Sequence, residues 1–179
     1  MAFIELNNNF PGIVGLMKYR PETAKPLNEL AEILLRGPSS ITSAEREMIA
    51  SYVSHQNECH FCHSSHGAAA AHHLDGNLDL LDDIKKNFQK TDISPKLRQL
   101  LGIAKKVQIL GNKVTIEDIE KAKNEGATDR EIHDTVLIAA AFCMYNRYVD
   151  GLGTWAPEEN EAYNDTGKML AHEGYLDSI

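Results

Sequence analysis

The stretch TSAEREMIASYVSHQNECHFCHSSHGAAAAHH, residues 42–73, sets the expected fold and holds the most reactive side chains of the chain. Thr42 with Glu45 three positions later has the capping-box spacing that begins a helix, and an Ala-rich run follows the two cysteines. We therefore predict two consecutive helices. The first begins at Thr42, and the second begins near Cys59 and ends before the DGN triplet at 75–77.

The same helical signals continue on both sides of this stretch. Capping residues and Gly or Pro stops divide the rest of the chain into segments typical of helices, at 12–20, 21–37, 78–89, 94–111, 115–126, 128–153 and 157–174. No segment alternates with period two for long enough to predict a strand. We predict the all-α class and a compact multi-helix bundle. The domain is expected to span residues 1–179, with a core at about 20–155 and a C-terminal helix at about 157–173.

Composition and charge exclude several classes of partner. The chain has 179 residues, which fits one domain, and a net charge of -8, so no basic face is available for nucleic acid or an anionic membrane. Its longest apolar run, 136–145, is too short to cross a bilayer. The first ten residues lack the pattern of a secretory signal. With only three cysteines, we expect a cytoplasmic protein with reduced thiols.

The helix expected at 134–150 is apolar almost all round. Two interpretations are open. It is either a helix-to-helix interface of an oligomer or the central core helix of the bundle.

The cysteine–histidine cluster supports three interpretations. On a helix that begins near Cys59, the side chains of Cys59, Cys62, His63 and His66 share one stripe and His60 points elsewhere. Thiolate is favoured at a helix N-terminus, so the first interpretation is a redox dithiol that closes to a disulfide, and we prefer it. The second is a zinc site formed by two cysteines and a histidine, which lacks an evident fourth ligand. The third is no chemistry.

Glu47 lies on the preceding helix, twelve residues before the first cysteine. If the two helices are antiparallel or angled, Glu47 reaches the histidine of the cluster and forms a proton relay with it. Alternatively, Glu45, Arg46 and Glu47 form a solvated first turn, and spacing alone favours this second interpretation.

A family resemblance reverses that preference. Four residues keep a spacing that resembles the alkylhydroperoxidase D-like core of the carboxymuconolactone decarboxylase superfamily, closest to its peroxidase-related branch: Glu47-x11-Cys59-x2-Cys62-x3-His66. Supporting stretches at 94–107, 117–132 and 139–153 extend the resemblance over most of residues 20–155.

The resemblance implies an all-helical, alkylhydroperoxidase D-like fold assembled as a homo-oligomer, a dimer, trimer or hexamer. It implies a peroxidase that reduces small hydroperoxides through a dithiol–disulfide cycle without a bound cofactor or metal. Cys62 would attack the peroxide, Cys59 would resolve the product, and His66 and Glu47 would form the proton relay. The reductant would be a dithiol protein, a lipoyl-type carrier or a small thiol.

One departure from the family pattern concerns the residue before the second cysteine. Alkylhydroperoxidase D itself tends to have His there, whereas this chain has Phe61 and carries its histidine at His60. That shift turns the imidazole by about one hundred degrees around the helix, away from Cys62. Two other functions remain open: a cofactor-free enzyme of the carboxymuconolactone decarboxylase type, and a zinc- or redox-sensing helical oligomer.

Overall fold

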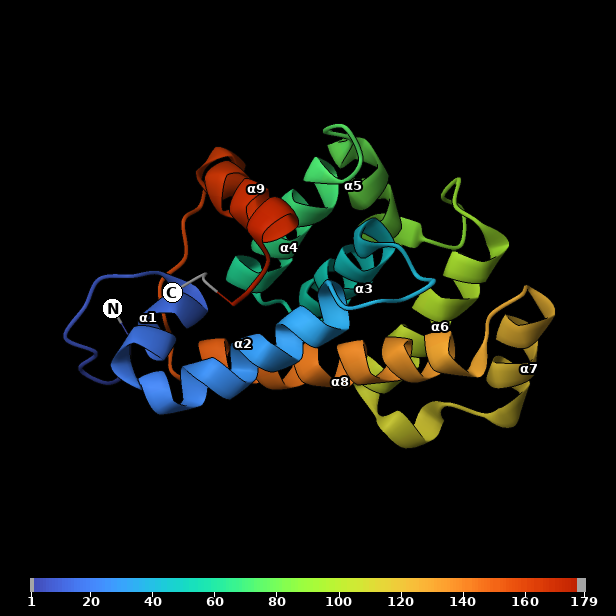
Figure 1. Ribbon diagram of the computed structural model, residues 1–179, viewed down its shortest axis with the longest axis horizontal. Helices are drawn as coiled ribbons and strands as arrows, with labels where there is room; N and C mark the ends of the chain where they lie inside the picture. Colours follow the sequence, from blue (N-terminus) through green and yellow to red (C-terminus); the bar gives the residue numbers. More distant parts are fainter. Residues whose placement is uncertain (1, 177–179) are drawn as a thin grey trace.

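The computed structural model describes residues 2–176, and every regular element in this range is helical (Figure 1). In chain order the elements are α1 (Gly12–Tyr19), α2 (Pro21–Leu35), α3 (Ser43–Gln56), α4 (His60–His72), α5 (Leu78–Asn87), α6 (Pro95–Ile109), the 3-10 helix η1 (Gly111–Lys113), α7 (Ile116–Asn124), α8 (Asp129–Gly151), the 3-10 helix η2 (Asn160–Tyr163) and α9 (Asn164–Glu173). The predicted all-helical class is confirmed.

Side-chain caps begin the helices where the sequence predicted them. Glu45 accepts the backbone N–H of Thr42 at 2.9 Å, and the Thr42 hydroxyl accepts the N–H of Glu45 at 3.2 Å. Thr128 and Glu131 form the same reciprocal pair before α8, at 2.7 and 3.2 Å. Each pair satisfies backbone N–H groups that the first helical turn leaves without a partner.

The C-terminal helix begins at Asn164, later than the predicted start near 157. The chain before it is held in another conformation by side chains that bond the carbonyl of Pro157. The Tyr163 hydroxyl donates to that carbonyl at 2.8 Å, and His60 Nε2 lies 2.9 Å from it. The N-terminal part of the predicted helix is therefore replaced by an irregular segment and η2.

The centre of the molecule is the α3–α4 pair, with α8 along one side and α9 across α4 (Figure 1). Ile49 and Val53 of α3 and Phe142 of α8 are at most 1% exposed and form part of the main apolar core. On α4 the small residues Ala69 and Ala70 are fully buried, which lets a neighbouring helix approach closely. This core holds the start of α4 in a fixed position.

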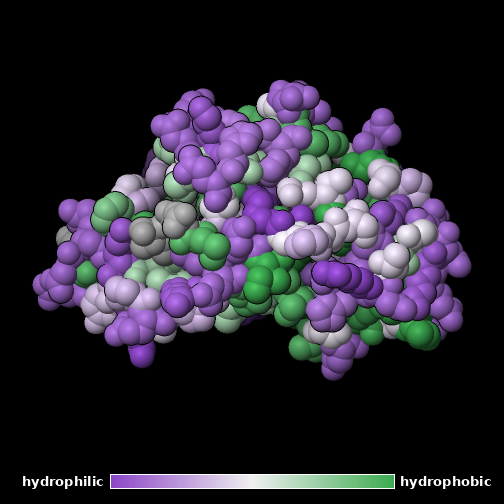
Figure 2. Space-filling model, in the orientation of Figure 1, coloured by the Kyte–Doolittle hydropathy of each residue, from purple (hydrophilic) through white to green (hydrophobic). Residues whose placement is uncertain are grey.

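The α8 helix packs into this core but keeps part of its surface exposed. Ile138 and Ala139 are fully buried, whereas Leu137 and Met144 are 36% and 45% exposed. Figure 2 shows an apolar area within a mostly hydrophilic face, where α2, with its exposed Ile33, crosses α8. The helix is thus a core helix, and an oligomer contact on its outer side stays a prediction. None of the described helices has the length and apolar character needed to span a membrane.

The contact between α4 and α9 depends on Gly167. A Cβ added there would lie 2.5 Å from the Cβ of Ala68. We expect Gly167→Ala to lower the free energy of unfolding by about 1–3 kcal/mol, because the helices would have to move apart. Gly102→Ala is the matched control: it is also inside a helix, nothing lies within 4 Å of its added Cβ, and it should stabilise by up to about 1 kcal/mol. Urea denaturation of both variants measures the difference, and equal effects would contradict the proposed contact.

Candidate active site

The dithiol lies at the beginning of α4, as predicted. Cys59 is the N-cap residue and Cys62 lies in the first turn, and both are free thiols with 0% and 4% of their surface exposed. A single turn therefore separates the two side chains, at the end of a helix where backbone N–H groups favour a negative charge.

The turn that leads from α3 into the dithiol is anchored by Asn57. Its side-chain amide donates to Asn146 Oδ1 at 2.8 Å, and its oxygen accepts a hydrogen bond from Gln108 at 2.9 Å. Asn146 in turn donates to the hydroxyl of Ser54 at 3.0 Å. The next residue, Glu58, has φ 61, a left-handed conformation that turns the chain sharply before Cys59. Contacts with α6 and α8 thus fix the direction in which α4 begins.

Glu47 is fully buried and its carboxylate meets His66 one helix away. His66 Nδ1 lies 2.7 Å from Oε2 of Glu47, while Arg36 Nη2 and the Tyr175 hydroxyl lie 2.5 and 2.6 Å from Oε1. The preceding residue, Arg46, is only 4% exposed. The interpretation of this segment as a solvated first turn is therefore wrong for Arg46 and Glu47, because α3 lies between other helices from its first turn onward.

The pKa of Glu47 is lowered despite its burial. Burial alone would raise this pKa, but the charge and hydrogen bond of His66, the charge of Arg36 and the hydrogen bond of Tyr175 together outweigh it. An ionised carboxylate accepts hydrogen bonds only, so the His66 nitrogen that it bonds, Nδ1, carries a proton. In the neutral imidazole this leaves Nε2 as the acceptor.

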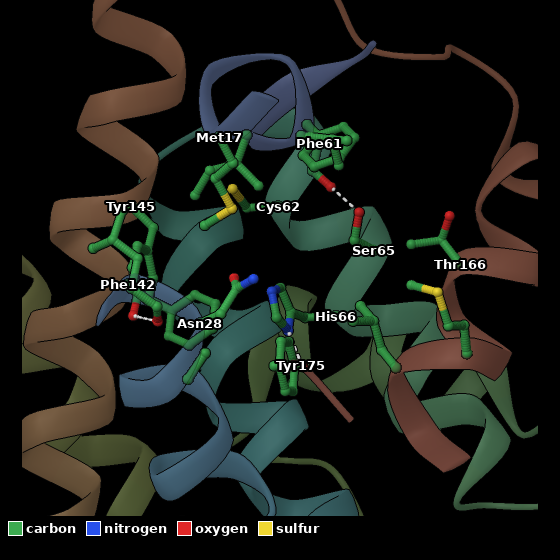
Figure 3. Close-up of a pocket in the computed structure, with 16 residues that line it drawn as sticks. Met17, Asn28, Phe61, Cys62, Ser65, His66, Phe142, Tyr145, Thr166 and Tyr175 are labelled. Carbon is green, nitrogen blue, oxygen red and sulfur yellow. Dashed lines mark hydrogen bonds between the residues drawn. The ribbon is translucent and has the colours of Figure 1, made fainter. Parts of the chain in front are cut away.

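A small apolar pocket of about 80 Å³ opens beside Cys62 and His66 (Figure 3). In the close-up the His66 ring lies between Tyr175 and Cys62, and the amide group of Asn28 points into the same space. The other walls are mainly apolar and come from five parts of the chain: Ile13, Val14, Met17, Leu27, Ala31, Phe61, Phe142, Tyr145, Met169 and Leu170. The arrangement brings a thiol and an imidazole to one mainly apolar pocket.

Cys59 has a different environment from Cys62. It lies in an apolar cluster with Phe61 and Val149. Its hydrogen bond to Cys62, its burial and the charge interaction between the two sulfurs raise the pKa of Cys59. Asp150 is also hydrogen-bonded to Cys59, and burial raises the pKa of this carboxyl group. The Cys59 thiol therefore holds its proton more strongly than an ordinary thiol.

The neighbouring histidines do not join the pocket. His60 is bonded to Pro157, consistent with its predicted direction away from Cys62. His63, expected on the cysteine stripe, instead faces the rings of His55 and His60 at 5.4 and 5.1 Å. Burial and the charge of Lys85 lower the pKa of His63 to about 4. Residues 2–176 contain no group of three or more His, Cys, Asp or Glu side chains placed to hold a metal ion.

Three participants were not found from the sequence. Arg36 is the C-cap residue of α2, and Tyr175 follows α9, so neither has a fixed spacing to the dithiol. Asn28 occupies a buried face of α2 that sequence reasoning treats as ordinary packing. The Gly37-Pro38 pair next to Arg36 marks only the end of a helix. Arg36 and Tyr175 complete the hydrogen bonds of Glu47, and Asn28 faces the pocket.

One part of this chain is similar to a known protein family. Residues 21–77 match the carboxymuconolactone decarboxylase family. The match spans α2 to α4 and so includes all four residues of the spacing pattern. The resemblance predicted from that pattern is thereby confirmed. Among curated proteins, no sequence matches this chain.

Two crystal structures are similar over most of the chain. One, from Ralstonia eutropha JMP134, is described as an alkylhydroperoxidase AhpD core and an uncharacterized peroxidase-related protein. It is 27% identical, with a TM-score of 0.78 over 88% of this chain and 81% of that one. The other, an uncharacterized peroxidase-related protein from Silicibacter sp. TM1040, is 26% identical, with a TM-score of 0.77 over 86% and 78% of the two chains. The fold is thus of the alkylhydroperoxidase D-like type.

The buried carboxylate gives a prediction on stability. Because the pKa of Glu47 is lowered by folding, its charged form stabilises the protein above pH 4.5, the ordinary value of the group, and this contribution disappears as pH falls through the lowered pKa. We expect Glu47→Gln to reduce the free energy of unfolding at neutral pH by about 3 kcal/mol, since the buried guanidinium of Arg36 loses its partner. The free energy of unfolding of the variant should also depend less on pH below 4.5 than that of the wild type.

The matched control is Glu29→Gln, which removes an exposed carboxylate 3.9 Å from Lys25. It should change the unfolding free energy by less than about 0.5 kcal/mol. Denaturant titrations of the three proteins across the acidic range measure both effects. A Glu47→Gln protein as stable as the wild type would show that the carboxylate is not needed to balance Arg36.

Proposed function

We propose that the protein is a thiol peroxidase that reduces small hydroperoxides through a Cys59/Cys62 dithiol–disulfide cycle. One observation carries the proposal: Cys62 and His66 line the same small pocket, and the ionised Glu47 orients the imidazole. The description of the two similar structures as peroxidase-related supports it. The pocket size and apolar walls suit a hydroperoxide with a short organic group, or hydrogen peroxide.

The first step is attack by the thiolate of Cys62 on the outer oxygen of the hydroperoxide. His66 Nε2 takes the thiol proton and returns it to the leaving alkoxide oxygen, so that the O–O bond breaks and an alcohol departs. The sulfur is oxidised to sulfenic acid and the peroxide is reduced. Glu47 stabilises the imidazolium that forms between the two proton transfers, and the amide of Asn28 is placed to hold the peroxide.

The second step joins the two sulfurs. The thiol of Cys59 loses its proton and attacks the sulfenic sulfur of Cys62, which releases water and forms the disulfide. Side chains three residues apart come close to the Cβ separation that a disulfide needs, most of all where the helix is just beginning, as it is at the N-cap Cys59. The raised pKa of Cys59 suits a thiol that reacts second.

An external dithiol then restores the enzyme. Two electrons and two protons from a dithiol protein or a lipoyl-type carrier return both cysteines to thiols, and the donor leaves as a disulfide. We propose further that the protein is a single cytoplasmic domain that works as a homo-oligomer. Recovery of the thiols with each class of donor identifies the reductant, and sedimentation of the purified protein measures the oligomer.

The family match favours one other function, a lactone decarboxylase. Such an enzyme needs general acid and base groups but no redox dithiol. Turnover of a lactone substrate that survives replacement of both cysteines would select it over the peroxidase.

The dithiol cycle predicts different fates for the three cysteine variants. Cys62→Ser should reduce peroxide turnover to background, because no nucleophile remains in the pocket. Cys59→Ser should react once and stop as a sulfenic acid, which a dimedone adduct detects by mass. Cys143→Ser is the control: this thiol lies on α8, 3.9 Å from the carbonyl of Gln108, and its loss should leave turnover intact. Full activity in Cys62→Ser would refute the assignment.

The proton relay predicts that a variant without His66 keeps both thiols but oxidises them more slowly. His66→Gln should lower kcat/KM for hydrogen peroxide by about 100-fold or more, the usual contribution of a general acid–base group. His63→Gln removes a nearby histidine that faces away from the pocket and should have little effect. Stopped-flow measurement of thiol oxidation compares the two. Equal rates in both variants would remove His66 from the mechanism.

A further inference from the structure

The segment after α9 enters the interior and reaches the Glu47–His66 pair from a distant part of the sequence. Gly174 has φ 83 and turns the chain inward at the end of α9. A carboxylate oxygen of Glu32 then accepts the backbone N–H of Tyr175 at 2.7 Å. Arg36 bonds the carbonyl of Leu170 at 2.9 Å, which ties α9 to the end of α2. These contacts fix where the side chain of Tyr175 points.

Tyr175 contacts every member of the charged group around Glu47. Its hydroxyl donates to Glu47 Oε1 at 2.6 Å and lies 3.2 Å from His66 Nδ1. Its ring stacks on the His66 ring with centroids 5.9 Å apart and planes 11° apart. The guanidinium of Arg36 lies over the Tyr175 ring, with its carbon 5.2 Å from the ring centroid. Tyr175 also lines the pocket beside Cys62 (Figure 3).

We propose that Tyr175 is a positioning residue of this site: its hydroxyl shares the carboxylate of Glu47 with His66 and so sets how strongly the imidazole holds a proton. The role of this proton in turnover rests on the proposed peroxidase function, but the coupling itself does not. The site is then complete only when the C-terminal segment is docked on α2 and α4.

The direction of the effect follows from the two hydrogen bonds of the carboxylate. A donor to Oε1 compensates part of the negative charge of Glu47, which weakens its attraction for a proton on His66. If the hydroxyl is removed, the imidazolium form is stabilised. His66 then stays protonated to a higher pH, at which it cannot accept the proton of Cys62.

The hydroxyl is a constant donor over the working pH range. Burial, and then the charge of Glu47, raise the pKa of Tyr175 well above its ordinary value. The other charged or titratable groups near the pair come from α2, α3, α4 and α8: Glu32, Arg36, Arg46, Cys62, His73 and Tyr145. Of these, Arg36 is hydrogen-bonded to Glu47. We expect this bond to persist in a variant that lacks only the hydroxyl of Tyr175.

The test is Tyr175→Phe, with Tyr145→Phe as the matched control. Tyr145 lines the same pocket, but its hydroxyl donates to the carbonyl of Leu27 at 3.0 Å and does not reach Glu47. The pKa of His66 is measured by NMR in protein labelled with 15N-histidine, and its signal is assigned by comparison with His66→Gln. We expect Tyr175→Phe to raise this pKa by about one unit, the size of one hydrogen bond to a charged group, and Tyr145→Phe to leave it unchanged.

Kinetics give a second readout. The acidic limb of kcat/KM against pH should move upward by the same amount in Tyr175→Phe and stay in place in Tyr145→Phe, whatever rate the control retains. A lower melting temperature with an unmoved His66 titration would reduce Tyr175 to a structural residue and overturn the inference. Equal shifts in both variants would also overturn it.

Failure of the proposed function would look different. A wild-type protein that turns over no hydroperoxide with any dithiol donor would refute the peroxidase, while the NMR shift in Tyr175→Phe would still establish the coupling between Tyr175 and His66.

Discussion

The site depends on one constraint, the compensation of a carboxylate that has no contact with water. Glu47 is fully buried, and a buried charge is tolerated only when it is paired and hydrogen-bonded. Its partners are Arg36 at the end of α2, His66 on α4 and Tyr175 after α9. Four parts of the chain must therefore meet at this carboxylate, and the position of the imidazole follows from their meeting.

The two thiols of the dithiol have different environments and therefore different chemical properties. Cys62 shares the pocket with His66, whereas Cys59 lies at the N-cap in an apolar cluster and has a raised pKa. The turn at Asn57 supports this difference, because its hydrogen bonds to α6 and α8 anchor the chain just before α4 begins. A cycle with one attacking and one resolving sulfur needs this asymmetry.

The local features of this structure can be predicted from its sequence, whereas those that depend on tertiary contacts cannot. Capping at Thr42 and the start of α4 near Cys59 are set by neighbouring residues, so they could be read from the chain. The burial of Glu47 could not be, because it depends on helices distant in sequence, and spacing alone favoured an exposed turn. Tyr175 carries no spacing signal at all. Only the family resemblance pointed to Glu47, and no pattern pointed to Tyr175.

The energetics of this buried charged network indicate that its presence is better explained by a chemical role than by a contribution to stability. Buried ion pairs seldom add net stability, because removing the charges from water costs about as much as their attraction returns, and apolar replacements of similar volume are often as stable. The adjoining pocket is lined mainly by apolar side chains, so His66 and Tyr175 are among its few polar members. A charged network next to a thiol supplies what a proton-transfer site requires, an imidazole oriented by an ionised carboxylate. The His66 ring lies between Tyr175 and Cys62, where it can serve the proposed reaction. The proposed reaction thus accounts for the desolvation cost of the buried charges.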